Sequence, residues 1–142
     1  MPDRLALIIT GTRQKLTKAD RDTIRAALTA FVAEHGRPKV VIHGDCKTGV
    51  DAFVNSRFQA PMLRVPADWI KWREAENVEA AGPVRNTAVV TIGKCLRDGS
   101  TYEVHWLAFP MGKSTGTRDC ARKCEQAGFA GRVVELGEVS GA

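Results

Sequence analysis

Three short segments of the chain combine glycines with basic and hydroxyl side chains, which are the residue types that bind phosphate. They are residues 10–13 (TGTR), 43–51 (HGDCKTGVD) and 110–119 (PMGKSTGTRD). Glycine lets the backbone turn sharply beside a ligand, and arginine presents a fork of donors to a phosphate or a carboxylate. Glycines and hydroxyl residues also end strands and cap helices in any α/β domain. Those structural roles do not explain why each of the three segments also has a basic side chain. Together the three segments predict a nucleotide or sugar-phosphate pocket.

Each segment has an expected role in that pocket. The second and third lead into helices, whose first N–H groups bind anions. Asp51 or Asp119 is expected to accept hydrogen bonds from ribose hydroxyls. The groups expected to hold phosphate are the side chains of Arg13, Lys47 and Lys113 and the amides of Gly44, Gly49, Gly112 and Gly116.

Two common nucleotide-binding motifs are absent from the sequence. Residues 112–114 (GKS) resemble the end of a P-loop, but the glycine that a P-loop needs five places before Gly112 is Leu107. Gly44 and Gly49 have the right separation, but Val50 and Asp51 follow in place of Lys-Ser/Thr. No G-x-G-x-x-G follows the first apolar run. The sequence therefore argues against a P-loop NTPase and against ordinary NAD binding.

Short apolar runs alternate with segments of helical periodicity along the chain, which is typical of a parallel sheet covered by helices on both faces. We predict an α/β fold, a three-layer Rossmann-like sandwich with a mainly parallel sheet of about five strands. Residues 1–137 form one domain and residues 138–142 a frayed tail. The expected strands are 5–10, 39–43, 62–65, 105–109 and 132–136. The expected helices are 17–35, 50–58, part of 68–81, a helix from Pro83 to a turn at Asp98-Gly99, and a helix that starts at Thr115 or Thr117 and runs to Ala127. Ligands of such sheets bind outside the carboxyl ends of the strands, where the three segments lie.

Composition and charge narrow the class of protein. The chain has 142 residues, of which 44% are hydrophobic and 26% charged, with a formal net charge of +5. No apolar run reaches the ~20 residues of a membrane span, and no signal-peptide pattern opens the chain, so we expect a cytoplasmic protein without membrane partners. The four cysteines form no Cys-x-x-Cys pair, and we expect them to be reduced. The positive charge allows nucleic-acid binding without demanding it.

Several motifs together resemble a known family. They are residues 11–13 (GTR), residues 43–51 (HGDCKTGVD), residues 66–69 (PADW) leading to 81–86 (AGPVRN), and residues 109–119 (FPMGKSTGTRD). In this order and over residues 5–128 the chain resembles the YspA-like (DUF2493) branch of the SLOG superfamily. These are Rossmann-like proteins related to the DNA-processing protein DprA and to LOG phosphoribohydrolases. The run AGPVRN between the other loops is the most specific element of the match.

The resemblance implies a nucleotide-derived ligand, no required cofactor, no metal site, and a homodimer or higher homo-oligomer. It adds Arg85 and Asn86 to the pocket, and Trp69 or Trp72 could stack on a base. The expected ligand-binding residues are then Gly11, Thr12, Arg13, His43, Gly44, Lys47, Gly49, Asp51, Arg85, Asn86, Pro110, Gly112, Lys113, Ser114, Thr115, Gly116 and Thr117.

The chain also departs from the family pattern. Asp45 replaces the second glycine of the His-Gly-Gly motif, and Cys120 occupies the position of the glutamate with which LOG enzymes cleave the base–ribose bond. Binding without strong catalysis is therefore the leading hypothesis. The alternative is an N-glycosidic hydrolase whose carboxylate is Asp45, Asp51 or Asp119.

Two further hypotheses stay open at this stage. Single-stranded nucleic-acid binding would follow from the likeness to DprA and from the positive charge. A nucleophilic Cys46, activated by the neighbouring Lys47 and by His43 as a base, is a minor one. Cys120 and Cys124 lie on the apolar face of their helix, where cysteine packs as a small hydrophobe.

Overall fold

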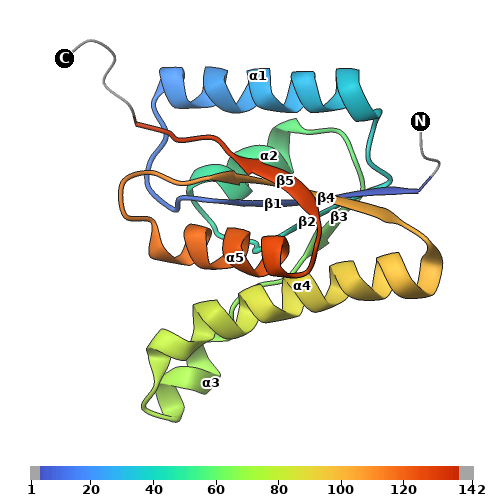
Figure 1. Cartoon of the computed structure of the whole chain (residues 1–142). Coiled ribbons are helices and arrows are strands. Elements are labelled where there is room, and N and C mark those ends of the chain that lie inside the picture. Colours follow the sequence, from blue (N-terminus) through green and yellow to red (C-terminus); the bar gives the residue numbers. More distant parts are fainter. Residues whose placement is uncertain (1–3, 138–142) are drawn as a thin grey trace.

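The computed structural model describes residues 4–137 and shows the α/β sandwich that the sequence predicts (Figure 1). Five parallel strands form one sheet in the order β3-β2-β1-β4-β5. The elements in chain order are β1 (Leu5–Gly11), α1 (Lys18–His35), β2 (Val40–His43), α2 (Gly49–Arg57), β3 (Met62–Arg64), α3 (Trp69–Glu74), the short 3-10 helix η1 (Val78–Ala80), α4 (Ala81–Ser100), β4 (Glu103–Phe109), α5 (Thr115–Gln126) and β5 (Ala130–Val133). The strand order reverses between β1 and β4, and this is where such sheets bind ligands.

Alternate residues of β1 enter two separate hydrophobic cores. Leu5, Leu7 and Ile9 pack with apolar side chains of α1 and α2 on one face of the sheet. Ala6 and Ile8 pack on the other face, where the apolar residues of α4 and α5 cover the sheet. Because every one of these β1 side chains is at most 1% exposed, each larger one contributes roughly 1.5–3 kcal/mol through burial. The central strand is therefore held rigidly from both sides.

The helix α1 has the ends that its sequence predicts. The Thr17 hydroxyl accepts a hydrogen bond from the Asp20 N–H at 3.1 Å, and the Asp20 carboxylate accepts one from the Thr17 N–H at 3.0 Å. This reciprocal capping box satisfies two N–H groups that the helix leaves free. Gly36 follows the last turn with a positive φ of 94°, and its N–H bonds to the Val32 carbonyl.

Several predicted element boundaries are wrong. The helix α4 begins at Ala81 rather than at Pro83, and β4 begins at Glu103 rather than at residue 105. Asp98-Gly99 is not a turn, because α4 continues to Ser100 and ends at Thr101 in the left-handed conformation. The guanidinium of Arg97 fixes this last turn by donating to the Ala127 carbonyl at 2.6 Å.

The last strand occupies residues 130–133 rather than 132–136, and Leu136 forms only an isolated bridge to Met111. Pairing with β4 begins early because Gly131 lies flat against the Trp106 indole, which leaves no room for a side chain. The predicted frayed tail, residues 138–142, lies outside the described residues.

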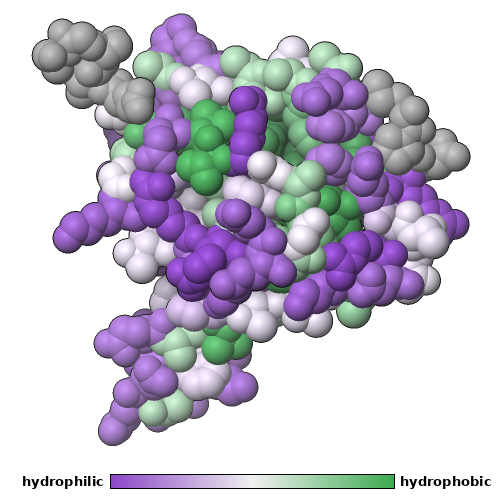
Figure 2. Space-filling view, viewed as in Figure 1, coloured by the Kyte–Doolittle hydropathy of each residue, from purple (hydrophilic) through white to green (hydrophobic). Residues whose placement is uncertain are grey.

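The segment of α3 and η1 projects from the body of the sandwich (Figures 1 and 2). Neither element contains a buried residue. Within residues 4–137, none of the helices has both the length and the apolar character needed to cross a membrane.

Candidate functional site

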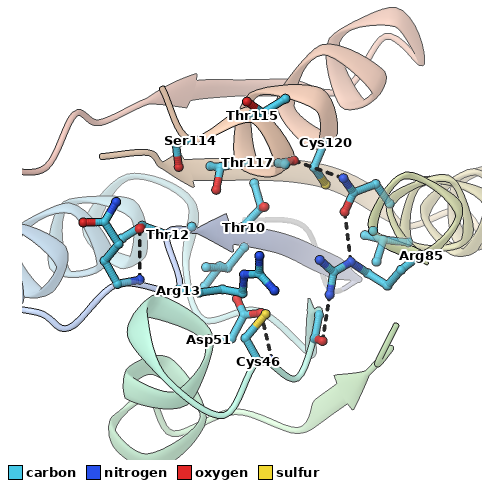
Figure 3. Close-up of a pocket in the computed structure, with 18 of the residues that line it drawn as sticks. Thr10, Thr12, Arg13, Cys46, Asp51, Arg85, Ser114, Thr115, Thr117 and Cys120 are labelled. Carbon is cyan, nitrogen blue, oxygen red and sulfur yellow. Dashed lines mark hydrogen bonds between the residues drawn. The ribbon is translucent and has the colours of Figure 1, made fainter. Parts of the chain in front are cut away.

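A pocket of about 530 Å³ opens at the carboxyl ends of β1, β2 and β4, as Figure 3 shows. Its size falls in the range of small-molecule sites. The first segment, the turn after β2 and the first turns of α4 and α5 form its walls. The lining residues are Ile9, Thr10, Gly11, Thr12, Arg13, Gln14, Gly44, Cys46, Asp51, Trp69, Gly82, Arg85, Asn86, Val89, Ser114, Thr115, Gly116, Thr117 and Cys120.

The first turn of α5 presents backbone donors to this pocket. Residues 114–117 line it, and the first intrahelical hydrogen bond runs from the Arg118 N–H to the Ser114 carbonyl at 3.0 Å. The N–H groups that precede Arg118 therefore have no acceptor inside the helix. Among the residues that the structure describes, no side chain caps this end; Ser114 itself has a left-handed conformation. An anion placed here would meet these donors and the positive end of the helix dipole.

Arg118 holds the loop before α5 from outside the pocket. Its guanidinium donates to the carbonyls of Gly112 and Lys113 at 2.7 and 3.0 Å, and it pairs with Glu135 at 2.7 Å. These bonds hold two carbonyl groups of the loop that leads into α5. Arg118 is thus a positioning residue for the helix N-terminus.

The turn after β2 is closed by its own contacts. The Asp45 N–H donates to His43 Nδ1 at 3.0 Å, the Cys46 N–H to Asp51 Oδ2 at 3.2 Å, and the Val50 N–H to the Thr12 carbonyl at 3.0 Å. Three amides of this turn are consequently bonded within the protein itself. Asp45 adopts a left-handed φ of 53° at the place where the family pattern has a glycine, a conformation that aspartate tolerates better than most residues.

Asp51 is a buried carboxylate at the floor of the pocket. The residue is 4% exposed, and its Oδ1 has no hydrogen-bond partner among the described residues. Burial raises the pKa of this carboxyl, although the Cys46 N–H and the charges of His43 and Arg85 act in the opposite direction. A buried oxygen without a partner is costly, so the site favours a ligand that donates a hydrogen bond to it.

Arg85 and Asn86 connect three walls of the pocket. Arg85 donates to the Gly44 carbonyl at 2.8 Å and to Asn86 Oδ1 at 2.9 Å. Asn86 in turn donates to the Gly116 carbonyl and to Asp119 Oδ2, both at 3.0 Å. A methyl group on Gly44 would lie 2.6 Å from Arg85 Cζ, so only glycine leaves room for the guanidinium. Asn86 is 1% exposed and fixes the wall rather than presenting a free amide.

Two guanidinium groups face the centre of the pocket. The side chains of Arg13 and Arg85 point toward one another in Figure 3, from the first segment and from α4. Arg13 also lies over the Trp69 ring, with Cζ 5.4 Å from its centroid. Because like charges repel, an anion between the two arginines would be stabilised by both.

The structure contradicts the hypothesis of a nucleophilic Cys46. Burial and the nearby Asp51 carboxylate raise the pKa of its thiol. Lys47 pairs instead with Asp45 at 3.4 Å. His43 cannot serve as the base, since Nδ1 accepts from the Asp45 N–H and Nε2 lies 3.1 Å from Asn55 Oδ1.

Cys120 and Cys124 are 2% and 0% exposed and pack in the core beneath α5, as the sequence predicts. Across the described part of the chain, no three metal-ligating side chains converge.

The structure brings most of the sequence-predicted site residues together and leaves others outside the pocket. Those that line it are Gly11, Thr12, Arg13, Gly44, Asp51, Trp69, Arg85, Asn86, Ser114, Thr115, Gly116 and Thr117. Those placed elsewhere are His43, Lys47, Gly49, Pro110, Gly112 and Lys113, together with the carboxylate candidates Asp45 and Asp119.

Sequence reasoning missed six lining residues: Ile9, Thr10, Gln14, Gly82, Val89 and Cys120. Thr10 could have been found, because it is the last residue before the glycine that ends the strand. Ile9 and Val89 give no polar signal and are indistinguishable in sequence from core residues.

No protein-family model matches the sequence. The chain is similar to the Gene 61 protein of Mycobacterium phage D29, with 29% identity over 140 residues, which cover 93% of this chain and 96% of that protein. The two proteins therefore correspond along nearly their whole length.

Proposed function

We propose that this protein binds an anionic, nucleotide-type ligand in the pocket at the carboxyl ends of β1, β2 and β4. One observation carries the proposal. The uncapped first turn of α5 and the arginines Arg13 and Arg85 line the same cavity as a buried carboxylate oxygen without a partner, that of Asp51. A ligand that satisfies both must carry an anion and a hydrogen-bond donor. The resemblance to the SLOG superfamily agrees with this requirement.

A nucleotide has groups for each part of the pocket. Its phosphate would accept hydrogen bonds from the amides of residues 115–117 and from Arg13. A ribose hydroxyl would donate to Asp51 Oδ1. The base would stack on Trp69, which lines the rim and is 37% exposed.

The first experiment is mass spectrometry of small molecules released when the purified protein is denatured. A thermal-shift panel of nucleoside mono-, di- and triphosphates, NAD, ADP-ribose and cyclic dinucleotides accompanies it. We expect one class to raise Tm, and Arg13→Ala to weaken its binding about tenfold because a charge-assisted hydrogen bond is lost. The control is Arg37→Ala, which removes a cation at the opposite end of β2 and should leave affinity unchanged. If no nucleotide raises Tm, the proposal fails.

The salt dependence of binding distinguishes a nucleotide pocket from a nucleic-acid surface. A ligand with one or two phosphates gives a shallow slope of affinity against salt, whereas single-stranded DNA held through several phosphates gives a steep one. Tight DNA binding with a steep slope, and no effect of mononucleotides, would replace the proposal with the nucleic-acid hypothesis.

N-glycosidic hydrolysis is the second candidate, and the position of Asp51 favours it. Of the three carboxylates considered from sequence, only Asp51 lines the pocket, and its raised pKa suits a general acid. Chromatography of incubated nucleotides would detect free base and ribose phosphate. If the protein is a hydrolase, Asp51→Asn should abolish turnover and preserve nucleotide binding. If it binds nucleotides without cleaving them, neither the wild-type protein nor the variant should release free base.

Self-association is part of the proposal. Large apolar side chains are exposed on α3, η1 and the first turn of α4, namely Trp69, Ile70, Val78 and Val84. Figure 2 shows apolar surface among the charged residues of this projecting segment. Sedimentation measurements would report a dimer or larger species if these side chains meet a second copy, and a monomer would refute it.

A further inference from the structure

We propose that Cys120 is a thiol–disulfide exchange site inside the pocket and forms a mixed disulfide with small anionic disulfides. This goes beyond the proposed function and does not require a nucleotide. Cys120 lies on the second turn of α5, directly behind the anion-binding N-terminus, and it lines the cavity with Thr10 and Arg85. Figure 3 shows its sulfur in the wall of the pocket.

The pocket is the route to this sulfur. The residue is 2% exposed and its other side packs in the core under α5. A reagent that reaches Cys120 must therefore pass Arg13, Arg85 and the open amides of α5. The partnerless Asp51 oxygen in the same cavity independently indicates that this space is built for a bound molecule.

The groups around Cys120 stabilise a thiolate. The Cys124 thiol, one turn away, lowers the pKa of Cys120, with smaller contributions from the Thr10 hydroxyl and the charge of Arg85; burial and Asp119 oppose them. The pKa of Cys46, which also lines the pocket, is raised by burial and by Asp51. Of the two thiols that line the pocket, Cys120 is therefore the one whose surroundings favour a thiolate.

The reaction balances without any further oxidant. Cys120 loses its proton to solvent, and the thiolate attacks one sulfur of the disulfide RS–SR. A bond forms between Cys120 Sγ and that sulfur while the RS–SR bond breaks, and its electron pair leaves with the second sulfur as a thiolate. That thiolate takes a proton from water. The disulfide is reduced and Cys120 is oxidised.

Thiosulfonates and a true disulfide test the proposal on the intact protein. The anionic sulfonatoethyl methanethiosulfonate is compared with its cationic trimethylammonium-ethyl analogue, and dithiodipropionate follows as an anionic disulfide. Non-reducing trypsin digestion separates all four cysteines, because Cys120 falls in residues 119–122 and Cys124 in residues 124–132. Cys95, which is exposed, is the internal reference for each reagent.

We expect the anionic reagent to label Cys120 about tenfold faster than the cationic one after normalisation to Cys95, because the pocket concentrates anions. Dithiodipropionate should add one half-molecule at the same cysteine. Arg13→Ala should reduce the ratio of the anionic to the cationic labelling rate at Cys120, and Arg37→Ala should leave that ratio unchanged. When the rate of Cys120 labelling is plotted against pH, Thr10→Val should shift the curve to higher pH. A purely structural change would not shift it.

Three results would overturn the proposal. They are an unlabelled Cys120 in folded protein whose Cys95 is fully labelled, equal rates for the two charged reagents, and faster labelling of Cys46 than of Cys120. None of them bears on nucleotide binding, which is measured separately.

Discussion

The turn after β2 and the loop after β4 are similar in sequence and differ in what they leave free. Each has a glycine and a lysine before a helix and a second glycine within the first residues of that helix. After β2, the N–H groups of Asp45, Cys46 and Val50 bond within the protein. After β4, Arg118 occupies carbonyls of the loop, and the amides of the first turn of α5 face the pocket. Under the proposed function, the β2 turn is scaffold and the first turn of α5 is the binding surface.

The difference indicates that a glycine-rich turn before a helix can offer an anion site only where its amides are not bonded within the protein. Gly49 illustrates the scaffold role. Its φ is +75°, and a Cβ there would collide with the backbone carbonyl of Thr12 and lie 2.7 Å from Arg13 Cα. Gly116 illustrates the opposite case, since nothing lies within 4 Å of the place where its Cβ would be.

Substituting these two glycines by alanine should give the largest contrast between the segments. Gly49→Ala combines a left-handed conformation with a backbone collision that no side-chain movement relieves, so we expect it to cost roughly 3 kcal/mol of the free energy of unfolding. Gly116→Ala should change stability by less than about 1 kcal/mol, in the stabilising direction, because alanine favours helix. Chemical denaturation followed by circular dichroism measures both. Equal losses would show that the two segments are not different.

The fold could be predicted from the sequence because, along most of the chain, the hydrophobic periodicity and the residues that start or end helices and strands indicate the same elements. Continuous apolar runs marked the buried strands, and Thr17 with Asp20 marked the start of α1. The errors occurred where a tertiary contact determines the end of a helix or the start of a strand. The bond from Arg97 to the Ala127 carbonyl carries α4 past Gly99, and the indole of Trp106 draws β5 two residues earlier. Neither contact leaves a local pattern.

The sequence predicts which loops form the candidate site, but it does not predict which of their side chains face the pocket. Strand order brings the three segments to one edge of the sheet, and that follows from alternating strands and helices. Which side chains face inward depends on partners distant in sequence. Lys47 is drawn to Asp45, and Asp119 is held by Asn86 and Lys123, so these charged residues stay out of the pocket.

The stability contributions of Asp51 and Asp119, the last residues of the second and third segments, should respond to pH in opposite ways. Burial alone would raise the pKa of Asp119, but hydrogen bonds from Lys123 and Asn86 lower it below 3.8. Its contribution is therefore present above that value and lost as pH falls. The pKa of Asp51 is raised from 3.8, so its contribution is present below 3.8 and lost as pH rises through the folded pKa.

We expect Asp119→Asn to cost about 1–2 kcal/mol near pH 7, and less as the pH falls toward 3.5. Asp51→Asn should become more favourable relative to wild type as the pH rises over the same range. Denaturation of all three proteins at several pH values gives both trends. Parallel trends would mean that the two carboxyls have the same environment, contrary to the structure.

The smallest expected effect belongs to Lys47 and Lys113, two of the residues that the sequence predicts to hold phosphate. The side chain of Lys47 is 88% exposed and pairs with Asp45, while Lys113 is exposed and lies outside the pocket. Because exposed charges contribute 0–1 kcal/mol at most, Lys47→Ala and Lys113→Ala should each change nucleotide affinity by less than about twofold. Nucleotide titrations of both lysine variants are compared with that of Arg13→Ala, for which we expect a tenfold loss of affinity. A comparable loss for Lys113→Ala would mean that the β4 loop folds over a bound phosphate; a loss for Lys47→Ala would mean that the β2 turn opens to bind one.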